Sequence, residues 1–518
     1  MIATLALGSL LAVAPGCETL KSVPLPDATI TAAEVVPAGP YTTGRGQAAQ
    51  PISLPTHCRV AVVLKPSPDS HIEMELWLPV ENWNGKFQAV GNGGWAGTIS
   101  FPAMASALRE GYATASNDTG HKGGSAQFAV GHPERVIDFG SRAMHEMTVK
   151  SKALVAAFYE RAPRLSYYSG CSTGGRQGMM EAQRYPDDFD AMLVGAPVYN
   201  MVHLNISQVS LQVDMLKEAS RIVPQQKVAM LANAVLAACD AKDGVKDGFL
   251  SDPESCTFDP ARLQCKGADT STSSGSPRAE SRGDEPNCLT AAQVESARGA
   301  YTAVKTKSGE TVYPGRSLGF EAGWRIPTPG AALNPLFGDM PRFVGRQNAN
   351  WDAMTFNLET DLALALKNAA GVEANDPNLS KFKARGGKLL LYHGWADPGP
   401  APTNTINYYS EVIRALGGSK QDNWMRLFLL PGVGHCGGGP GPDQADFMGA
   451  LERWRESGTP PDQIRASHVA NNRVDMTRPI CPYPQVAQYK GVGSTNDAAN
   501  FVCKTPSRAT VSNQTTTP

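Results

Sequence analysis

The stretch GCSTG at residues 170–174 decides the fold of this chain. It matches G-x-S-x-G, a sharp turn between a strand and a helix that lifts a serine hydroxyl above a sheet. Residues 165–169 are β-prone and residues 173–185 have helical character, so the required elements flank the turn. Gly170 and Gly174 stand where larger side chains would crowd a strained backbone. These features predict that Ser172 is a nucleophile at the N-terminus of a helix, which stabilises negative charge.

A second match to the same motif, GRSLG at residues 315–319, lacks this context. No good strand precedes it and no clear helix follows it. We therefore expect Ser172, and not Ser317, to be the nucleophile.

The segment GHCG at residues 434–437 supplies a histidine that, like Ser172, has a cysteine as its neighbour. If His435 is the base that activates Ser172, the two side chains come within hydrogen-bond reach. Cys171 and Cys436 are then also close, near the Cα separation of about 5.5–6 Å that a disulfide needs. The single assumption that His435 activates Ser172 thus explains why each of these residues has a cysteine neighbour.

The acid that would orient His435 is expected between the serine and the histidine in chain order. Residues 388–392 (KLLLY) predict a strand, and Asp397 lies just past its carboxyl end, where such sheets place active groups. The order Ser172, Asp397, His435 is that of α/β-hydrolases. A turn-capping role is the alternative for Asp397. His393 is a rival base, but it precedes the acid and a structural role is favoured.

An oxyanion hole needs two backbone N–H donors. Thr173, the residue after the nucleophile, supplies one. The segment GNGGW at residues 91–95 follows a predicted strand at 86–90, and Gly94 is the candidate for the second donor. The alternative for this segment is a plain β-turn.

Short apolar segments alternate with helical ones in two regions, which is typical of a mostly parallel sheet covered by helices. Strands are expected at 59–64, 73–78, 86–90, 112–116, 165–169, 191–194, 388–392 and 425–430, and helices at 142–160, 173–185, 403–416 and 443–457. Between the two regions the alternation stops. We therefore expect a catalytic domain made of 15–198 and 377–504, interrupted by a lid domain at 199–376 that contains a flexible loop at 266–287. Residues 1–14 are expected to be a signal peptide and 505–518 a disordered tail.

Composition narrows the class of protein. The chain has 518 residues, 42% of them hydrophobic, with 47 basic and 48 acidic side chains and a net charge of −1. This balance gives no electrostatic basis for binding nucleic acid or an anionic membrane. Ten cysteines fit five disulfides and an oxidising compartment, the alternative being ten buried thiols in the cytosol.

The N-terminus supports export. An apolar run ends in AVA at residues 12–14, the small-x-small pattern of signal cleavage, although no Lys or Arg precedes it. No later run of about 18 apolar residues follows, so no membrane span is expected after the signal. The sequence therefore predicts a secreted or periplasmic protein.

The loop CDAKDGVKDGF at residues 239–249 concentrates carboxylates between turn-forming glycines. Hard oxygen ligands of this kind suit Ca²⁺, although the spacing is not that of an EF-hand. The alternative is a solvated acidic turn, and Cys256 is a candidate to close the loop onto Cys239. A bound ion here would be structural, and no organic cofactor is expected. The candidate ligands are the side chains of Asp240, Asp243 and Asp247 and the carbonyls of Val245 and Phe249.

Four motifs together resemble the tannase/feruloyl esterase family: GCSTGGRQ at 170–177, GAP at 195–197, HGWAD at 393–397 and GHCGGGPG at 434–441. The resemblance runs from Cys17 to Cys503. It implies an α/β-hydrolase fold with a large inserted lid, a Ca²⁺ site at the five residues above, and the disulfide Cys171–Cys436 as a hallmark. The other implied disulfides are Cys17–Cys58, Cys239–Cys256, Cys265–Cys288 and Cys481–Cys503.

The resemblance also implies a substrate class, because family members cleave esters of hydroxycinnamic and gallic acids. One branch cleaves mono(2-hydroxyethyl) terephthalate, and this chain resembles that branch in its length and in the segment RPICPYP at 478–484. It departs from it at Thr173, where the terephthalate enzyme has an acidic residue. Arg342 and Arg346 are candidates, by position only, for that enzyme's carboxylate-binding lid arginine, the alternative being surface arginines. Feruloyl-type substrates are therefore favoured over terephthalate monoesters and galloyl esters.

Trp95 and Trp395 are expected as walls of an aromatic pocket, with core packing as the alternative. The prediction from the sequence is a serine esterase acting on small aromatic esters. The alternative from another class is a non-catalytic hydrolase-fold binding protein, which usually lacks a triad member. A broad esterase without aromatic preference is a third possibility.

Overall fold

The computed structural model describes residues 16–41, 52–266, 287–319, 321–328, 332–369, 371–418 and 421–506. The expected signal peptide, almost all of the polar loop at 266–287 and all but two residues of the expected tail lie outside these ranges.

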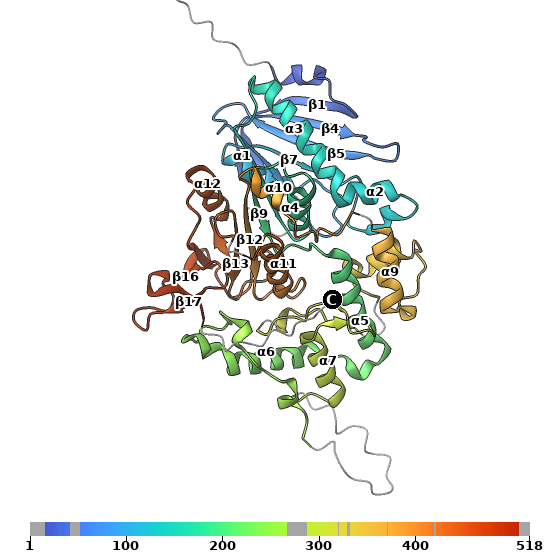
Figure 1. Cartoon of the computed structure of the whole chain (residues 1–518), viewed down its shortest axis with the longest axis vertical. Helices are drawn as coiled ribbons and strands as arrows, with labels where there is room; N and C mark the ends of the chain where they lie inside the picture. The colour runs from blue at the N-terminus through green and yellow to red at the C-terminus, as the bar shows by residue number, and fades with distance from the viewer. Residues whose placement is uncertain are drawn as a thin grey trace, which may run out of the picture.

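A nine-stranded sheet forms the centre of the molecule (Figure 1). Its first four strands pair antiparallel, and from the fourth strand onward every pair is parallel. Strands distant in sequence become neighbours, so the active-site loops meet at one edge. In spatial order the strands are β1 (Ala28–Val36), β4 (His57–Leu64), β5 (Ile72–Pro79), β7 (Ala113–Asn117), β6 (Lys86–Val90), β8 (Leu165–Cys171), β9 (Ala191–Gly195), β12 (Lys388–Gly394) and β13 (Met425–Leu430).

Helices cover both faces of this sheet, and alternate residues of each central strand point to opposite layers. In β12, for example, Leu389 and Leu391 belong to one buried cluster and Leu390 to another. The strand residues facing the first layer pack against α3 (Ala143–Tyr159), α4 (Thr173–Arg184) and α11 (Pro402–Ala415). Those facing the second pack against α1 (Phe101–Arg109) and α12 (Phe447–Ser457). This is the α/β-hydrolase arrangement that the sequence predicts.

The predicted elements differ from the structure mainly at their ends. The helix expected at 443–457 begins at Phe447, because the Asp446 side chain caps it by accepting a hydrogen bond from Gly449 N–H at 2.7 Å. Residues 443–446 instead include β14 (Gln444–Ala445), which pairs with β15 (Ile464–Ala470), itself paired with β16 (Arg473–Ile480). The remaining short elements are β2 (Gly39–Tyr41), β3 (Ile52–Leu54), β17 (Val486–Tyr489), β18 (Phe501–Lys504), α2 (Pro133–Ile137) and α10 (Ser380–Ala384).

The strand–helix alternation is interrupted between β9 and β12. We call residues 199–376 the inserted segment. Its described residues are drawn in green to orange in Figure 1 and gather below and beside the sheet, next to α11. One buried cluster lies wholly within the segment, and a second joins it to residues of the catalytic domain such as Trp95 and Phe139. Its elements are α5 (Met201–Lys217), α6 (Gln225–Cys239), α7 (Ala291–Tyr301), β10 (Val304–Lys305), β11 (Thr311–Tyr313), α8 (Pro335–Asp339) and α9 (Leu358–Asn368).

One helical stretch within the described residues, Ala219–Asp243, is long and apolar enough to cross a membrane by length and composition alone. It contains α6, whose Val228, Leu231 and Val235 are buried in the core of the inserted segment. A buried core helix passes the same test, so this stretch is weak evidence for a membrane span.

All ten cysteines are paired, which removes the alternative of ten buried thiols. The five disulfides are those that the family resemblance implies: Cys17–Cys58, Cys171–Cys436, Cys239–Cys256, Cys265–Cys288 and Cys481–Cys503.

Candidate active site

Ser172 occupies a strained turn between β8 and α4. Its φ of 64° and ψ of −123° lie in a region that residues other than glycine rarely adopt. A Cβ atom on Gly170 would stand 2.7 Å from the Gly174 carbonyl oxygen, so the turn can close this tightly only with glycine there. The backbone N–H of Ser172 donates to the Gly195 carbonyl at the end of β9, at 2.9 Å. The turn thus raises the hydroxyl above the carboxyl edge of the sheet.

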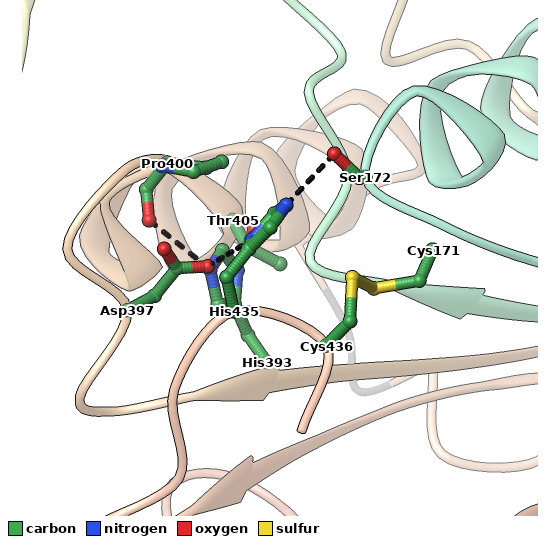
Figure 2. The surroundings of a disulfide bond; sticks show 8 residues. All are labelled: Cys171, Ser172, His393, Asp397, Pro400, Thr405, His435 and Cys436. Carbon is green, nitrogen blue, oxygen red and sulfur yellow. Dashed lines mark hydrogen bonds and ion pairs between the residues drawn. A yellow bond between two sulfur atoms is a disulfide. The ribbon is translucent and has the colours of Figure 1, made fainter. Parts of the chain in front are cut away.

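Three side chains form a continuous hydrogen-bonded chain at this edge (Figure 2). His435 Nε2 lies 2.8 Å from Ser172 Oγ, and His435 Nδ1 lies 2.6 Å from Asp397 Oδ2. Asp397 follows β12 and is buried, whereas a third of the His435 side chain is exposed. A buried carboxylate, an imidazole and a serine hydroxyl in this order can generate a nucleophile and stabilise the imidazolium that forms.

A second histidine, His393, also lies within hydrogen-bond distance of Asp397. His393 is fully buried, and its Nε2 lies 3.1 Å from the same oxygen, Asp397 Oδ2, while its Nδ1 lies 2.8 Å from the Thr405 hydroxyl. Burial raises the pKa of Asp397, but the hydrogen bonds from His393 and His435 outweigh it and hold that pKa below its usual range. His393 makes no contact with Ser172, so its geometry is that of a group that positions the carboxylate.

The disulfide Cys171–Cys436 lies directly beside this chain, as Figure 2 shows. Its Cα atoms are 6.0 Å apart, within the separation expected from the sequence. The bond joins the last residue of β8 to the loop that follows β13. It therefore ties the segment that carries Ser172 to the segment that carries His435.

The two candidate oxyanion donors lie next to each other. Thr173 is the first residue of α4, so its N–H has no acceptor within the helix. The Thr173 hydroxyl donates to the Gly94 carbonyl at 3.0 Å, and both residues line the cavity at Ser172. Gly94 has a φ of 56°, a conformation that glycine adopts without strain. Among the described residues the Gly94 N–H has no hydrogen-bond acceptor.

A pair of amides missed by sequence reasoning fixes the distance between these donors. Gln177 of α4 accepts a hydrogen bond from Asn92 N–H at 3.0 Å and donates one to Asn92 Oδ1 at 3.1 Å. Asn92 in turn donates to the carbonyls of Thr98 and Asn117. Gln177 stands in the GCSTGGRQ motif, so the motif itself was the available signal.

A narrow cavity of about 90 Å³ opens above Ser172 and His435. The inserted segment supplies nine of the seventeen lining residues, five of them from α5 and two from α8. The lining is apolar with amide and guanidinium groups: Val198, Met201, Leu204, Leu336 and Phe337, then Asn205, Gln208, Gln212, Arg316 and Arg325. A larger, more open groove around Ala219, Pro224 and Thr290 contains none of the three residues of the hydrogen-bonded triad.

Neither tryptophan expected at the pocket lines this cavity. Trp95 is 2% exposed, stacks on Phe139 and donates its indole N–H to the Leu336 carbonyl at 2.9 Å. Trp395 is 3% exposed and belongs to the main core. Both rings therefore pack in the interior, which is the alternative role that the sequence left open. The hydrogen bond from Trp95 holds the backbone of Leu336, which lines the cavity.

The arginines of the cavity are also not those expected. Arg342 and Arg346 are absent from the lining, and Arg346 Nε donates to Asp361 Oδ1 at 2.6 Å. Arg316 and Arg325 line the cavity instead. Arg316 Nη2 donates to Gln208 Oε1 at 2.7 Å, and its buried Nε has no hydrogen-bond partner among the described residues. Burial lowers the pKa of Arg316 to about 10, so the group remains a cation at neutral pH. Arg316 precedes Ser317, the second motif match, which lies in a loop after β11.

The acidic loop has the chemistry of a hard-cation site. Asp240 accepts hydrogen bonds from Asp247 N–H and Gly248 N–H at 3.2 and 3.0 Å, which wraps the loop around its carboxylate. Burial raises the pKa of Asp247 to about 6, although Arg478 donates to its Oδ2, and its buried Oδ1 has no partner among the described residues. No described residue donates to the carbonyls of Val245 and Phe249. Oxygens left unsatisfied in this way fit Ca²⁺.

Comparisons with known proteins agree on one family. The family model described as tannase and feruloyl esterase matches residues 58–504. The chain is 35% identical to an uncharacterized esterase of Xanthomonas campestris pv. campestris, over 96% of this chain and 93% of that protein. It is 31% identical to a probable feruloyl esterase B-1 of Aspergillus oryzae, over 94% of this chain and 92% of that protein. The crystal structure of feruloyl esterase B from Aspergillus oryzae superposes with a TM-score of 0.84 at 31% identity, covering 94% of this chain and 99% of that one.

Proposed function

Because the chain belongs to the tannase and feruloyl esterase family, and is thus a carboxylic ester hydrolase, we propose that it is a serine esterase for aromatic carboxylic esters of the feruloyl or hydroxycinnamoyl type. The observation that carries this proposal is the hydrogen-bonded chain from Ser172 through His435 to Asp397 at the floor of a largely apolar cavity. All three side chains of this hydrogen-bonded triad are present, which argues against a non-catalytic binding protein.

In the proposed mechanism Ser172 Oγ attacks the ester carbonyl while His435 Nε2 takes the hydroxyl proton. The N–H groups of Gly94 and Thr173 hold the negative oxygen that forms. His435 then protonates the leaving alcohol, and an acyl-enzyme on Ser172 remains. Water, activated by the same imidazole, releases the acid. Asp397 keeps His435 in the required tautomer throughout.

The cavity suits an aromatic acyl group with polar substituents. Met201, Leu204 and Phe337 offer apolar surface for a ring and its side chain. Asn205, Gln208 and Gln212 offer amides that can pair with ring hydroxyl or methoxy oxygens. This combination supports a hydroxycinnamate, and galloyl esters fit the same description with more hydroxyls.

Arg316 supports a second candidate, a hydrolase of mono(2-hydroxyethyl) terephthalate. That substrate carries a free carboxylate on the ring, opposite the ester. A buried guanidinium with an unpartnered Nε is a suitable partner for such a group. Arg325 lines the same cavity and adds a second positive charge.

The test is a hydrolysis panel of methyl ferulate, methyl gallate and mono(2-hydroxyethyl) terephthalate, with Ser172→Ala as the control. We expect methyl ferulate to be turned over best and every activity to vanish in the variant. Arg316→Gln separates the two candidates. If terephthalate monoesters are substrates, this change lowers their kcat/KM by about tenfold or more, as expected for a lost hydrogen bond to a charged group, and spares methyl ferulate. Activity that persists in Ser172→Ala would contradict the mechanism.

We further propose that Asp240, Asp243 and Asp247, with the carbonyls of Val245 and Phe249, hold a structural Ca²⁺. The unsatisfied oxygens of the loop support this. We also propose that the protein acts in a secreted or periplasmic setting, which the five disulfides support.

A further inference from the structure

Three side chains of metal-ligating type converge at the far end of α4 from Ser172. His145 comes from α3, Glu181 from the last turns of α4, and Asp188 from the loop that leads into β9. One ligand atom of each lies within 4.8 Å of the other two. His145 Nδ1 and Asp188 Oδ2 are 2.6 Å apart, and the His145 ring is held by stacking on Tyr185 at 3.9 Å between ring centroids.

Glu181 is the unusual member of this group. Its side chain is completely buried, and its carboxylate oxygens have no hydrogen-bond partner among the described residues other than the neighbouring Asp188 carboxyl group. An ionised carboxylate in this condition is strongly unfavourable. Burial raises the pKa of Glu181 well above its ordinary value, and the neighbouring Asp188 carboxylate raises it further. The group therefore needs either a proton or a cation.

The charged groups around Glu181 do not supply that cation directly. Lys152 interacts electrostatically with Glu181, but its Nζ donates to the backbone carbonyl of Asp188 and lies 5.8 Å from the Phe189 ring centroid. Arg385 pairs with Asp190 at 3.4 Å and donates to the Phe189 carbonyl. The Tyr168 hydroxyl donates to the Gly174 carbonyl at 2.6 Å. Each of these donors is engaged elsewhere.

We propose that His145, Glu181 and Asp188 bind a structural divalent transition-metal ion, with Zn²⁺ as the best match. An imidazole nitrogen beside two carboxylates is a typical zinc ligand set, whereas Ca²⁺ and Mg²⁺ prefer oxygen ligands alone. Zinc–ligand bonds of about 2.0–2.2 Å place the ligand atoms of a tetrahedral site about 3.3–3.6 Å apart. Binding would therefore move His145 Nδ1 and Asp188 Oδ2 apart from their present 2.6 Å and bring the more distant ligand atoms closer together. The His145 side chain is 29% exposed, which leaves a route for the ion and room for a water as fourth ligand.

Such an ion would anchor the helix that carries the nucleophile. Glu181 lies eight residues beyond Thr173, about 12 Å along α4 at 1.5 Å per residue. The ion would clamp α4 to α3 and to the start of β9, and it would touch no reacting atom. Its role is to hold the helix in place.

The test is a zinc titration of the whole chain. The enzyme is stripped with a chelator, returned to excess Ca²⁺ to occupy the acidic loop, and titrated with Zn²⁺ by calorimetry, with bound zinc counted after gel filtration. We expect one tightly bound Zn²⁺ per chain and a higher Tm with zinc. His145→Gln and Glu181→Gln should each weaken zinc binding by about tenfold or more.

His468→Gln is the matched control, because His468 Nδ1 also lies 2.7 Å from a carboxylate, Asp475 Oδ1, but on the surface and with no third ligand. This variant should keep the wild-type zinc affinity. Failure of the wild-type chain to bind zinc, or equal binding by His145→Gln and Glu181→Gln, overturns the proposal and leaves a proton shared between Glu181 and Asp188. His145→Gln, at a partly exposed position, decides the question if Glu181→Gln does not fold.

Discussion

Removal of the disulfide beside the active site should reduce stability and turnover together. The perturbation is the double substitution Cys171→Ala with Cys436→Ala, which leaves no free thiol. The two cysteines are 265 residues apart. The loop-entropy relation then gives an upper limit of about 5–6 kcal/mol for the stabilisation lost. Because the bond also ties the Ser172 segment to the His435 loop, we expect kcat to fall by about tenfold or more, as for a misplaced catalytic group.

The matched control is Cys17→Ala with Cys58→Ala at the distant edge of the sheet. These cysteines are 41 residues apart, for which the same relation gives about 4 kcal/mol. The assay is denaturant unfolding combined with kcat and KM for the best substrate of the panel, under conditions where both variants are folded. The control should lose stability and keep kcat. If the Cys171/Cys436 variant keeps kcat within twofold of wild type, the disulfide does not position His435 and the reasoning is refuted.

Three further outcomes follow from the site. Asp397→Asn should lower kcat/KM by about 10⁴-fold across pH 5–8. The folded-state pKa of Asp397 lies below its unfolded value of about 3.9, so the ionised carboxylate stabilises the fold above about pH 3.9. This stabilisation is lost only as the pH falls through the folded-state pKa, so about pH 5–8 lies within the stable range. An Asp397→Asn variant with wild-type kcat/KM at about pH 5 would contradict the role of Asp397. His393→Gln should lower kcat by about 10–100-fold, far less than His435→Gln, if it only positions the carboxylate; equal losses would make His393 a candidate base. Removal of Ca²⁺ by a chelator should lower Tm, and Asp243→Asn should abolish that shift; a chelator-insensitive Tm, with the metal shown to be gone, would contradict the calcium loop.

The sequence was sufficient for the parts of the site that depend on local chain geometry. A strand, a glycine-flanked serine and a helix follow one another without a break, so the turn at Ser172 could be inferred without tertiary information. The assumption that His435 meets Ser172 predicted that Cys171 and Cys436 lie close together, and the two are joined by a disulfide in the structure.

The cavity wall could not be inferred in this way. Its residues come mostly from the inserted segment, where periodicity predicts elements but not which side chains face inward. Trp95 and Trp395 were attractive as aromatic walls, yet large rings gain most from complete burial, and both lie in the interior. No sequence motif singles out Arg316 as a cavity residue. The role of a buried cation depends on which groups surround it, and these are distant in sequence.

The position of the inserted segment between β9 and β12 also imposes an order on biosynthesis. Cys171 leaves the ribosome long before its partner, and all four cysteines of the inserted segment appear before Cys436 does. Oxidation in the order of appearance would join Cys171 to Cys239, so the native pairing requires that Cys171 wait or be reshuffled. Meanwhile β9 stands as an open sheet edge, because its partner β12 is not yet made. Production of this chain is therefore expected to depend on thiol–disulfide isomerisation in the compartment where it matures.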